Sequence, residues 1–165
     1  MSGKTLLSRK ALAVVFALLV GVGVAACAPP APAPTSSGAP GDAFQSQLYS
    51  AVNADRGSVG EPGFGWNAAL AAKATAWAQQ MANANSLYHQ NLSALLGDPC
   101  CSGFHTLGEN IVVGPGSMSA ASIEAAWRAS ALHWANITNR AFTVIGIGYY
   151  RAPDGRIWAV QDFGG

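Results

Sequence analysis

The chain has little charge. Only 10% of its 165 residues are Asp, Glu, Lys or Arg, whereas about 25% is usual for a soluble domain. It has no basic patch of the kind that follows a phosphate backbone, so nucleic acid is not an expected partner. Because ionisable side chains are scarce, any that gather in one place are candidates for chemistry.

Cysteine is also scarce. The chain has three, and two of them, Cys100 and Cys101, are neighbours. Paired CxxC spacing is absent, which argues against a cysteine-based zinc site. Adjacent Cα atoms lie about 3.8 Å apart, below the range of about 4.4–6.8 Å that disulfides prefer, so a bond between these two would form a strained ring. We predict this vicinal disulfide, with a loop staple or two free thiols as the alternatives.

Residues 1–27 have the pattern of an export signal. Three cations lie near the start, residues 11–24 are apolar, and the segment ends in Val24-Ala25-Ala26-Cys27. This ending resembles a bacterial lipobox, which implies cleavage before Cys27 and acylation of that residue. The alternative is an uncleaved membrane anchor, for which the apolar stretch is short. The expected location is extracytoplasmic, with an N-terminal lipid holding the protein to the cell membrane.

Residues 28–41 are rich in Pro, Ala and Ser and are predicted to be a semi-extended tether. Residues 42–165 are enough for one domain with a single core. Loss of Lys4, Arg9 and Lys10 with the signal would leave six Lys and Arg against eight acidic residues, a balance of −2.

Three main helices are expected in this domain. Asp42 is a candidate N-cap for a helix that ends near Gly57, and Asn67 for a longer one that ends near Ser86. Residues 91–96 predict one short helical turn. Ser117 or Ser119 is expected to cap the third main helix, with His133 at or beyond its end.

The strands are expected mainly near the C-terminus. Residues 142–150 are β-branched and aromatic, with glycines that permit close backbone approach, and residues 156–163 form the returning strand of a hairpin. Residues 111–113 could add a short strand. The predicted class is α+β, with three main helices around a small antiparallel sheet.

Three scattered polar residues point to chemistry: His89, Glu109 and His133, with Glu109 in the stretch Gly108-Glu109-Asn110-Ile111. Two imidazoles and a carboxylate from separate segments suit a shared polar pocket. Two other polar residues have simpler expected roles. Asn110 should hydrogen-bond local backbone, and Arg56 should pair with a carboxylate.

An ordered set of motifs runs through the domain. Its members are Asn53-Ala54-Asp55-Arg56, Trp66-Asn67 with Leu70, Ala76-Trp77-Ala78 with Met81, His89, Gly108-Glu109-Asn110-Ile111, Trp127 with Ser130 and His133, Ile145-Gly146-Ile147-Gly148, and Trp158 to Gly164. Together they resemble the bacterial branch of the CAP superfamily, the SCP-like domains of cysteine-rich secretory, antigen 5 and pathogenesis-related proteins. The resemblance covers nearly all of residues 43–164. It implies an extracytoplasmic α-β-α sandwich.

The resemblance also implies a cleft. His89, Glu109 and His133 match three of the four polar residues that line it in the family. The second glutamate of many eukaryotic members falls on Ser130, and Trp134 stands where bacterial relatives usually have arginine. Family members variously bind divalent metal, often zinc, or sterols and lipids, and peptidase activity is proposed for a few.

Three roles for this site follow. His89 and His133 could hold zinc or another divalent metal weakly, with Glu109 orienting a ligand and His105 as a possible third ligand. Glu109 could instead be the catalytic base of a metal-assisted hydrolase acting on peptide or cell-wall material. The three side chains could also simply lock segments together. We expect a binding or envelope-associated module for a small-molecule, lipid or envelope ligand, with the hydrolase as the alternative.

Overall fold

The computed structural model of the protein describes residues 38–165. The predicted signal, Cys27 and most of the predicted tether therefore lie outside the described residues. The helices are α1 (Ala43–Ser58), α2 (Ala68–Ala84), α3 (Leu92–Leu95), the 3-10 turn η1 (Pro99–Cys101), α4 (Ala120–Ala129) and α5 (Ala131–Ile137). The strands are β1 (Gly65–Trp66), β2 (Leu107–Pro115), β3 (Val144–Arg151) and β4 (Arg156–Gly164).

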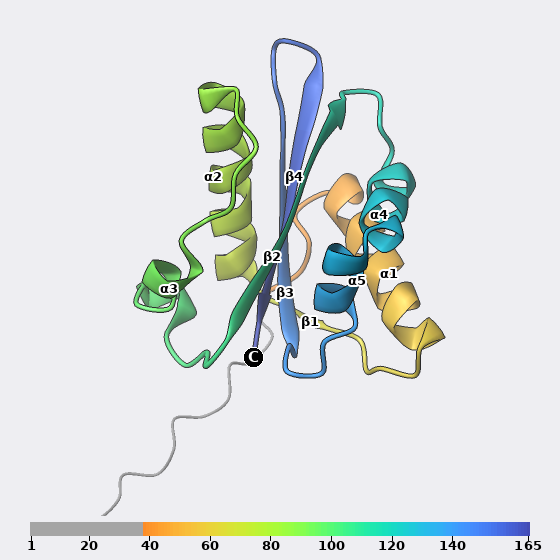
Figure 1. The fold of residues 1–165 in the computed structure, drawn as a ribbon, viewed down its shortest axis with the longest axis vertical. Helices are drawn as coiled ribbons and strands as arrows, with labels where there is room; N and C mark the ends of the chain where they lie inside the picture. Colours follow the sequence, from red (N-terminus) through yellow and green to blue (C-terminus); the bar gives the residue numbers. More distant parts are fainter. Residues whose placement is uncertain (1–37) are drawn as a thin grey trace, which may run out of the picture. The chain divides into compact units, whose positions relative to one another are not determined.

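The elements form three layers. The sheet has the order β1-β3-β4-β2; α2 and α3 lie on one side of it, and α1, α4 and α5 lie on the other (Figure 1). This confirms the predicted α+β class and the α-β-α sandwich. The chain needs two separate apolar cores to hold these layers, one on each face of the sheet.

The predicted helix starts are confirmed. The side chain of Asp42 accepts a hydrogen bond from the Gln45 backbone N–H, that of Asn67 accepts one from Leu70, and that of Ser119 accepts one from Ser122. Each cap satisfies a backbone donor that the first helical turn leaves free.

The predicted third main helix is α4, and His133 lies beyond its end as predicted. Helix α4 ends at Ala129, Ser130 takes an extended conformation with ψ 121°, and α5 begins at Ala131. Helix α5, which contains His133, was not predicted. Hydrophobic periodicity did not reveal this break because helix-forming residues flank a single extended one.

The sheet is mixed, not wholly antiparallel as predicted. Strand β1 pairs in parallel with β3, while β2 and β3 both pair antiparallel with β4. Strand β2 runs over nine residues instead of three. Its first half, Gly108-Glu109-Asn110, has low strand propensity, so its extended form depends on the ladder with β4.

Close helix packing holds the α2 layer on the sheet. A Cβ atom at Gly146 or Gly148 would overlap the backbone of α2, which confirms the predicted close approach. Met81 and Ala78 of α2 pack with Trp158 and other buried residues of one core. The opposite core lies under α1 and α4 and includes Trp127.

Arg56 joins α1 to α5. The expectation that Arg56 pairs with a carboxylate was wrong. Its guanidinium is buried and donates to the carbonyl oxygens of Pro62, Ile137 and Asn139. It also lies 3.9 Å from the ring centre of Phe64. Burial lowers the pKa of Arg56, an effect that Glu61 partly opposes.

Candidate functional site

His89 and Glu109 form a close pair on the α2 side of the sheet. The His89 Nδ1 atom lies 2.6 Å from Glu109 Oε1. The two side chains differ in exposure, 60% for His89 and 1% for Glu109. We assign the ring proton to Nδ1, because a carboxylate accepts it there. The Nε2 atom of His89 is then the nitrogen with a lone pair available for a ligand.

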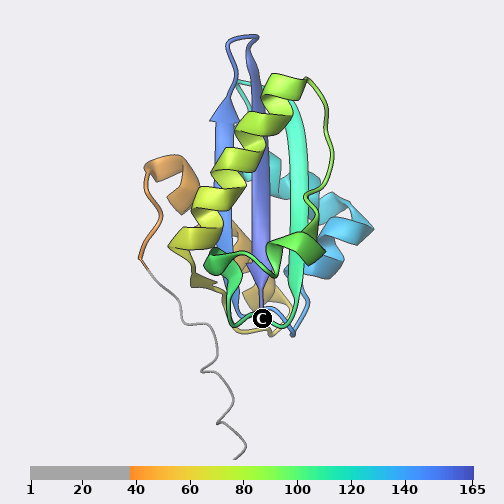
Figure 2. The same ribbon diagram turned by 90° about the vertical axis from the view of Figure 1, so that its left-hand side faces the viewer.

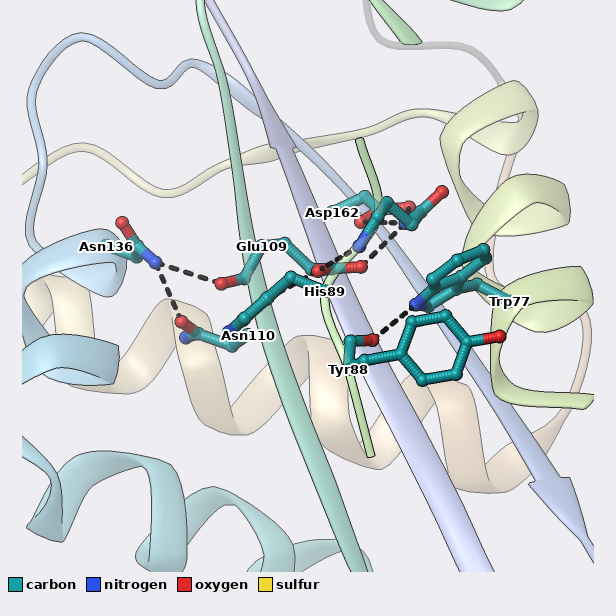
Figure 3. A network of polar contacts seen from close by, with 8 residues as sticks. Trp77, Tyr88, His89, Glu109, Asn110, Asn136 and Asp162 are labelled. Carbon is teal, nitrogen blue, oxygen red and sulfur yellow. Dashed lines mark hydrogen bonds and ion pairs between the residues drawn. The ribbon is translucent and has the colours of Figure 1, made fainter. Parts of the chain in front are cut away.

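The segment that carries His89 is anchored to α2. The indole N–H of Trp77 donates to the Tyr88 carbonyl oxygen at 3.0 Å (Figure 3). The rings of the same two residues pack edge to face, with centres 4.9 Å apart. This anchor fixes the backbone immediately before His89.

Gln90 fixes the carboxylate of Glu109. Its backbone N–H donates to Glu109 Oε1 at 3.0 Å, and its side-chain Nε2 donates to Glu109 Oε2 at 2.7 Å. The same Nε2 lies 3.0 Å from Asp162 Oδ1. Asp162 is the direct cross-strand partner of Glu109 on β4. Burial, with the nearby charge of Glu109, raises the pKa of Asp162 well above its ordinary range, which favours its neutral form.

Asn110 connects β2 to α5 on the other face of the sheet. The residue is fully buried. Its Nδ2 donates to Gln161 Oε1 at 3.0 Å and to the His133 carbonyl oxygen at 3.2 Å. Asn136 Nδ2 donates in turn to Asn110 Oδ1 and to the Glu109 carbonyl oxygen (Figure 3). The expectation that Asn110 hydrogen-bonds local backbone was wrong, since these contacts join residues that are far apart in the sequence.

This chain of amides continues to Glu124 on α4. Gln161 Nε2 donates to Glu124 Oε2 at 2.9 Å, and the buried Glu124 Oε1 makes no hydrogen bond within residues 38–165. Burial, together with the charge of Asp55, raises the pKa of Glu124 to about 8, although the bond from Gln161 opposes the shift. Glu124 is therefore mainly neutral at pH 7.

His133 contributes a nitrogen without a partner. Its Nδ1 is buried and makes no hydrogen bond in the described part of the chain. Burial lowers the pKa of His133, and the charge of His89 lowers it further. The segments that carry the two imidazoles come from opposite faces of the sheet.

A metal at this site would have two histidine ligands at most. Among residues 38–165 no group of three or more His, Cys, Asp or Glu side chains is arranged to hold a metal ion. The exposed His105 therefore supplies no third ligand beside His89 and His133. The remaining donors are His89 Nε2 and the unpartnered His133 Nδ1, while both oxygens of Glu109 are already occupied by hydrogen bonds.

Ser130 and Trp134 occupy the two positions that depart from the family pattern. Ser130 is the single extended residue between α4 and α5, and its side chain makes no capping bond. The ring of Trp134 lies 5.5 Å from the Arg128 guanidinium. Neither residue adds a carboxylate to the site.

Cys100 and Cys101 lie beside the α2 core, and both are free cysteines here, with sulfur atoms 2.6 Å apart. Burial raises the pKa of both thiols, which makes the reactive thiolate form scarce. The vicinal disulfide stays a prediction.

Gln90, Asp162, Gln161 and Glu124 were not among the predicted site residues. Two of them could have been found from the hairpin register, since Gln161 and Asp162 lie opposite Asn110 and Glu109. That signal required knowing that β2 begins at Leu107 and pairs with β4.

The model of the cysteine-rich secretory protein family, CAP, matches residues 49–163. The chain belongs to the CAP family. No curated protein matched. Three bacterial structures with the same fold illustrate the relationship. An outer surface protein of Borrelia burgdorferi has a TM-score of 0.64 at 19% identity, over 71% of this chain and 88% of that one.

The other two are longer proteins. An extracellular protein of Bacillus anthracis containing an SCP domain has a TM-score of 0.59 at 25% identity, over 72% of this chain and 39% of that one. A cysteine-rich secretory protein of Staphylococcus aureus has a TM-score of 0.60 at 19% identity, over 76% of this chain and 40% of that one. The CAP domain of this chain thus matches less than half of either protein.

Between residues 38 and 165, none of the helices combines the length and the apolar character that a membrane span requires.

Proposed function

We propose that this CAP protein is an extracytoplasmic, lipid-anchored binding module of the bacterial envelope, with a weak divalent-cation site formed by His89 and His133. The observation that carries the cation site is the buried Nδ1 of His133, which makes no hydrogen bond within the described residues. A buried polar atom normally has a partner, and a neutral imidazole nitrogen is a common metal ligand.

Glu109 supports the proposal as a positioning residue. A histidine that binds metal usually donates its other ring N–H to a carboxylate, which fixes its orientation. His89 has this arrangement with Glu109, at 2.6 Å. Zinc bound there would supply a Lewis acid; the residues of this chain hold and orient the ligand nitrogens.

The expected affinity is low and depends on pH. Structural zinc sites use four protein ligands, whereas this site offers two. Metal binding requires neutral imidazoles, so uptake should weaken as the pH falls. The lowered pKa of His133 keeps that ligand available to lower pH than an ordinary histidine.

Calorimetric titration with zinc tests the site. We expect weak uptake by the wild-type protein that is lost in His89→Ala and in His133→Ala. His105→Ala is the matched control and should bind like the wild type, since His105 is exposed and outside the site. Absence of binding heat in the wild type would refute the cation site.

The anchor rests on the sequence Val24-Ala25-Ala26-Cys27. Metabolic labelling with a radioactive fatty acid should label the wild-type protein and not Cys27→Ser, which should also leave the membrane fraction. Equal labelling of the two proteins would exclude Cys27 as the acylated residue.

The hydrolase alternative needs Glu109 as a base. Its side chain is only 1% exposed and accepts hydrogen bonds from His89 and from both nitrogens of Gln90. This environment favours a positioning role over proton abstraction. We therefore expect no release of fragments from peptide or cell-wall substrates in the presence of zinc. Turnover that Glu109→Gln abolishes in a folded protein would support the hydrolase instead.

A further inference from the structure

Strand β2 forms one outer edge of the sheet (Figure 2). In an antiparallel ladder, alternate residues turn their backbone N–H and C=O groups to the partner strand or away from it. Thr106, just before β2, exchanges both backbone bonds with Gly165, just after β4. Even-numbered residues of β2 therefore bond to β4, and odd-numbered ones direct their backbone groups outward.

Most of the outward groups in the middle of β2 lack a partner. The Glu109 carbonyl oxygen accepts from Asn136 Nδ2 at 3.1 Å. The N–H groups of Glu109, Ile111 and Val113, and the carbonyl oxygens of Ile111 and Val113, make no hydrogen bond with any described residue. The strand stays extended through Pro115, so these groups repeat at the spacing of a regular strand.

The opposite edge of the sheet is closed. The outward carbonyl oxygens of Thr143 and Ile145 accept from the backbone N–H groups of Gly65 and Asn67. The next one along β3, that of Ile147, accepts from Gln45 Nε2 at 3.0 Å. The fold thus pairs the outward carbonyl oxygens of residues 143–147 with its own residues, whereas those of Ile111 and Val113 accept no hydrogen bond from the described residues.

The open edge also lacks the usual protection. Exposed edges are normally guarded by lysine, proline or a bulge that prevents pairing with another chain. Residues 111–113 are Ile-Val-Val, and the proline comes only at position 115. Val112 and Val113 are partly exposed, whereas Ile111 is 6% exposed. An unguarded apolar edge of this kind is suited to a strand from a partner.

We infer that the outer edge of β2 binds an extended, uncharged peptide segment, which adds a strand to the sheet beside the His89–Glu109–His133 site. Alternating donors and acceptors along an edge are matched by another extended backbone, the pattern of β-strand addition. The inference rests on the proposed binding role and names the class of partner. It does not require a bound cation.

The surroundings favour a single strand over a second copy of the whole domain. Gln90 on one side and Asn136 on the other already contact Glu109, so the segments that carry them flank the edge. A single added strand lies only about 4.8 Å from β2, whereas a second sheet would bring its own helices against both segments. Leu87 and Leu132, which are 47% and 81% exposed, belong to the same two segments and offer apolar surface for peptide side chains.

Amide hydrogen exchange on the full-length chain in detergent gives the test. The probe is a capped five-residue peptide of alternating valine and threonine. In the free protein, the amide of the partly exposed Val113 should exchange quickly and that of Val112 slowly, since only Val112 faces β4. Saturating peptide should slow exchange at Val113 and leave Val112 unchanged. Unchanged exchange at Val113 would overturn the inference.

Val113→Pro removes one outward N–H without breaking the ladder to β4, and proline is tolerated at such edge positions. Loss of one backbone hydrogen bond and the added ring should weaken peptide binding at least about tenfold. Val113→Ala, which keeps the N–H, is the matched control and should retain binding. Equal peptide affinity in a folded Val113→Pro would contradict the inference.

Two further measurements distinguish a second copy from a peptide at the edge, and failure of the edge from failure of the cation site. Self-association of the wild type that Val113→Pro abolishes would replace the peptide with a second copy as the occupant. Zinc titration of Val113→Pro should match the wild type. Failure of zinc binding with intact peptide protection would remove the cation site and leave the edge, and the reverse result would remove the edge alone.

Discussion

The two faces of β2 carry polar clusters of different kinds. On the α2 side, the cluster is centred on carboxyl groups: Glu109 and Asp162 are bridged by Gln90 and end at the exposed His89. On the α4 and α5 side it is centred on amides, which run from Glu124 to the carbonyl oxygen of His133 on α5.

The two clusters differ in role: the carboxyl cluster positions the ring of His89, and the amide cluster supports the fold. The carboxyl cluster fixes one exposed ring and leaves its second nitrogen free, whereas the amide cluster joins four elements, β2, β4, α4 and α5. Changes to the amide cluster should therefore act mainly on stability, and changes to the carboxyl cluster mainly on ligand binding.

The largest effect is expected from Glu124→Gln. The folded state raises the pKa of Glu124 from 4.5 to about 8, so the folded protein holds a proton that the unfolded chain releases. The stability of the wild type should fall as the pH rises from about 4.5 to 8, by roughly 4–5 kcal/mol from this residue. Urea unfolding at pH 5 and pH 9 should show this loss in the wild type and a smaller one in Glu124→Gln.

Asp162→Asn provides the matched comparison on the other face. The pKa of Asp162 is also raised. The Asp162→Asn variant should therefore also lose less stability than the wild type between pH 5 and pH 9. If Glu124→Gln and the wild type lose equal stability between pH 5 and pH 9, Glu124 is ionised in the folded protein and the assignment is wrong.

The next largest effect should come from Asn110→Ala. It leaves the Gln161 Oε1 and Asn136 Nδ2 atoms without their partner in a buried site, at a cost of about 3 kcal/mol in the free energy of unfolding. Asn83→Ala, on the exposed surface of α2, should change it by less than about 0.5 kcal/mol. Equal unfolding free energies for the two variants would contradict a supporting role for the amide cluster.

Gln90→Ala should weaken zinc binding more than it lowers the stability of the fold. We expect a smaller loss of about 1–2 kcal/mol in unfolding free energy but a fall in zinc affinity of about tenfold or more, since Glu109 loses the donor that fixes it. Gln79→Ala on the exposed face of α2 is the control. Unchanged zinc affinity in Gln90→Ala would show that Glu109 does not depend on Gln90.

The smallest effect on stability should follow His89→Ala. Because its side chain is 60% exposed, the free energy of unfolding should change by less than about 0.5 kcal/mol, while zinc binding is lost. A thermal melt and a zinc titration on the same sample compare the two effects. A large loss of stability would place His89 among the supporting residues.

Much of the fold was predictable because it depends on local signals. Asp42, Asn67 and Ser119 cap helices as predicted, and the glycines of β3 mark the close approach of α2. Local signals failed where tertiary pairing decides. The two-residue strand β1 has no pattern of its own, and the first half of β2 is extended only because β4 pairs with it.

Only some residues of the candidate site were predicted from the sequence. His89, Glu109 and His133 were singled out as scarce polar residues and then matched to the family pattern. Gln90 and Asp162 were missed because their role arises from the β2–β4 register. Glu124 was missed because a carboxyl group on a helix is usually solvated, whereas here α1 and the sheet bury it.

The central claim is that histidines from opposite faces of β2 share one cation. Nitrogen NMR of the histidine rings during a zinc titration tests it directly. The account predicts that the ring signals of His89 and His133 shift together over the same range of zinc concentration, with the change at Nε2 of His89 and Nδ1 of His133, while His105 stays unchanged. A shift of one ring alone, or of neither, would contradict it.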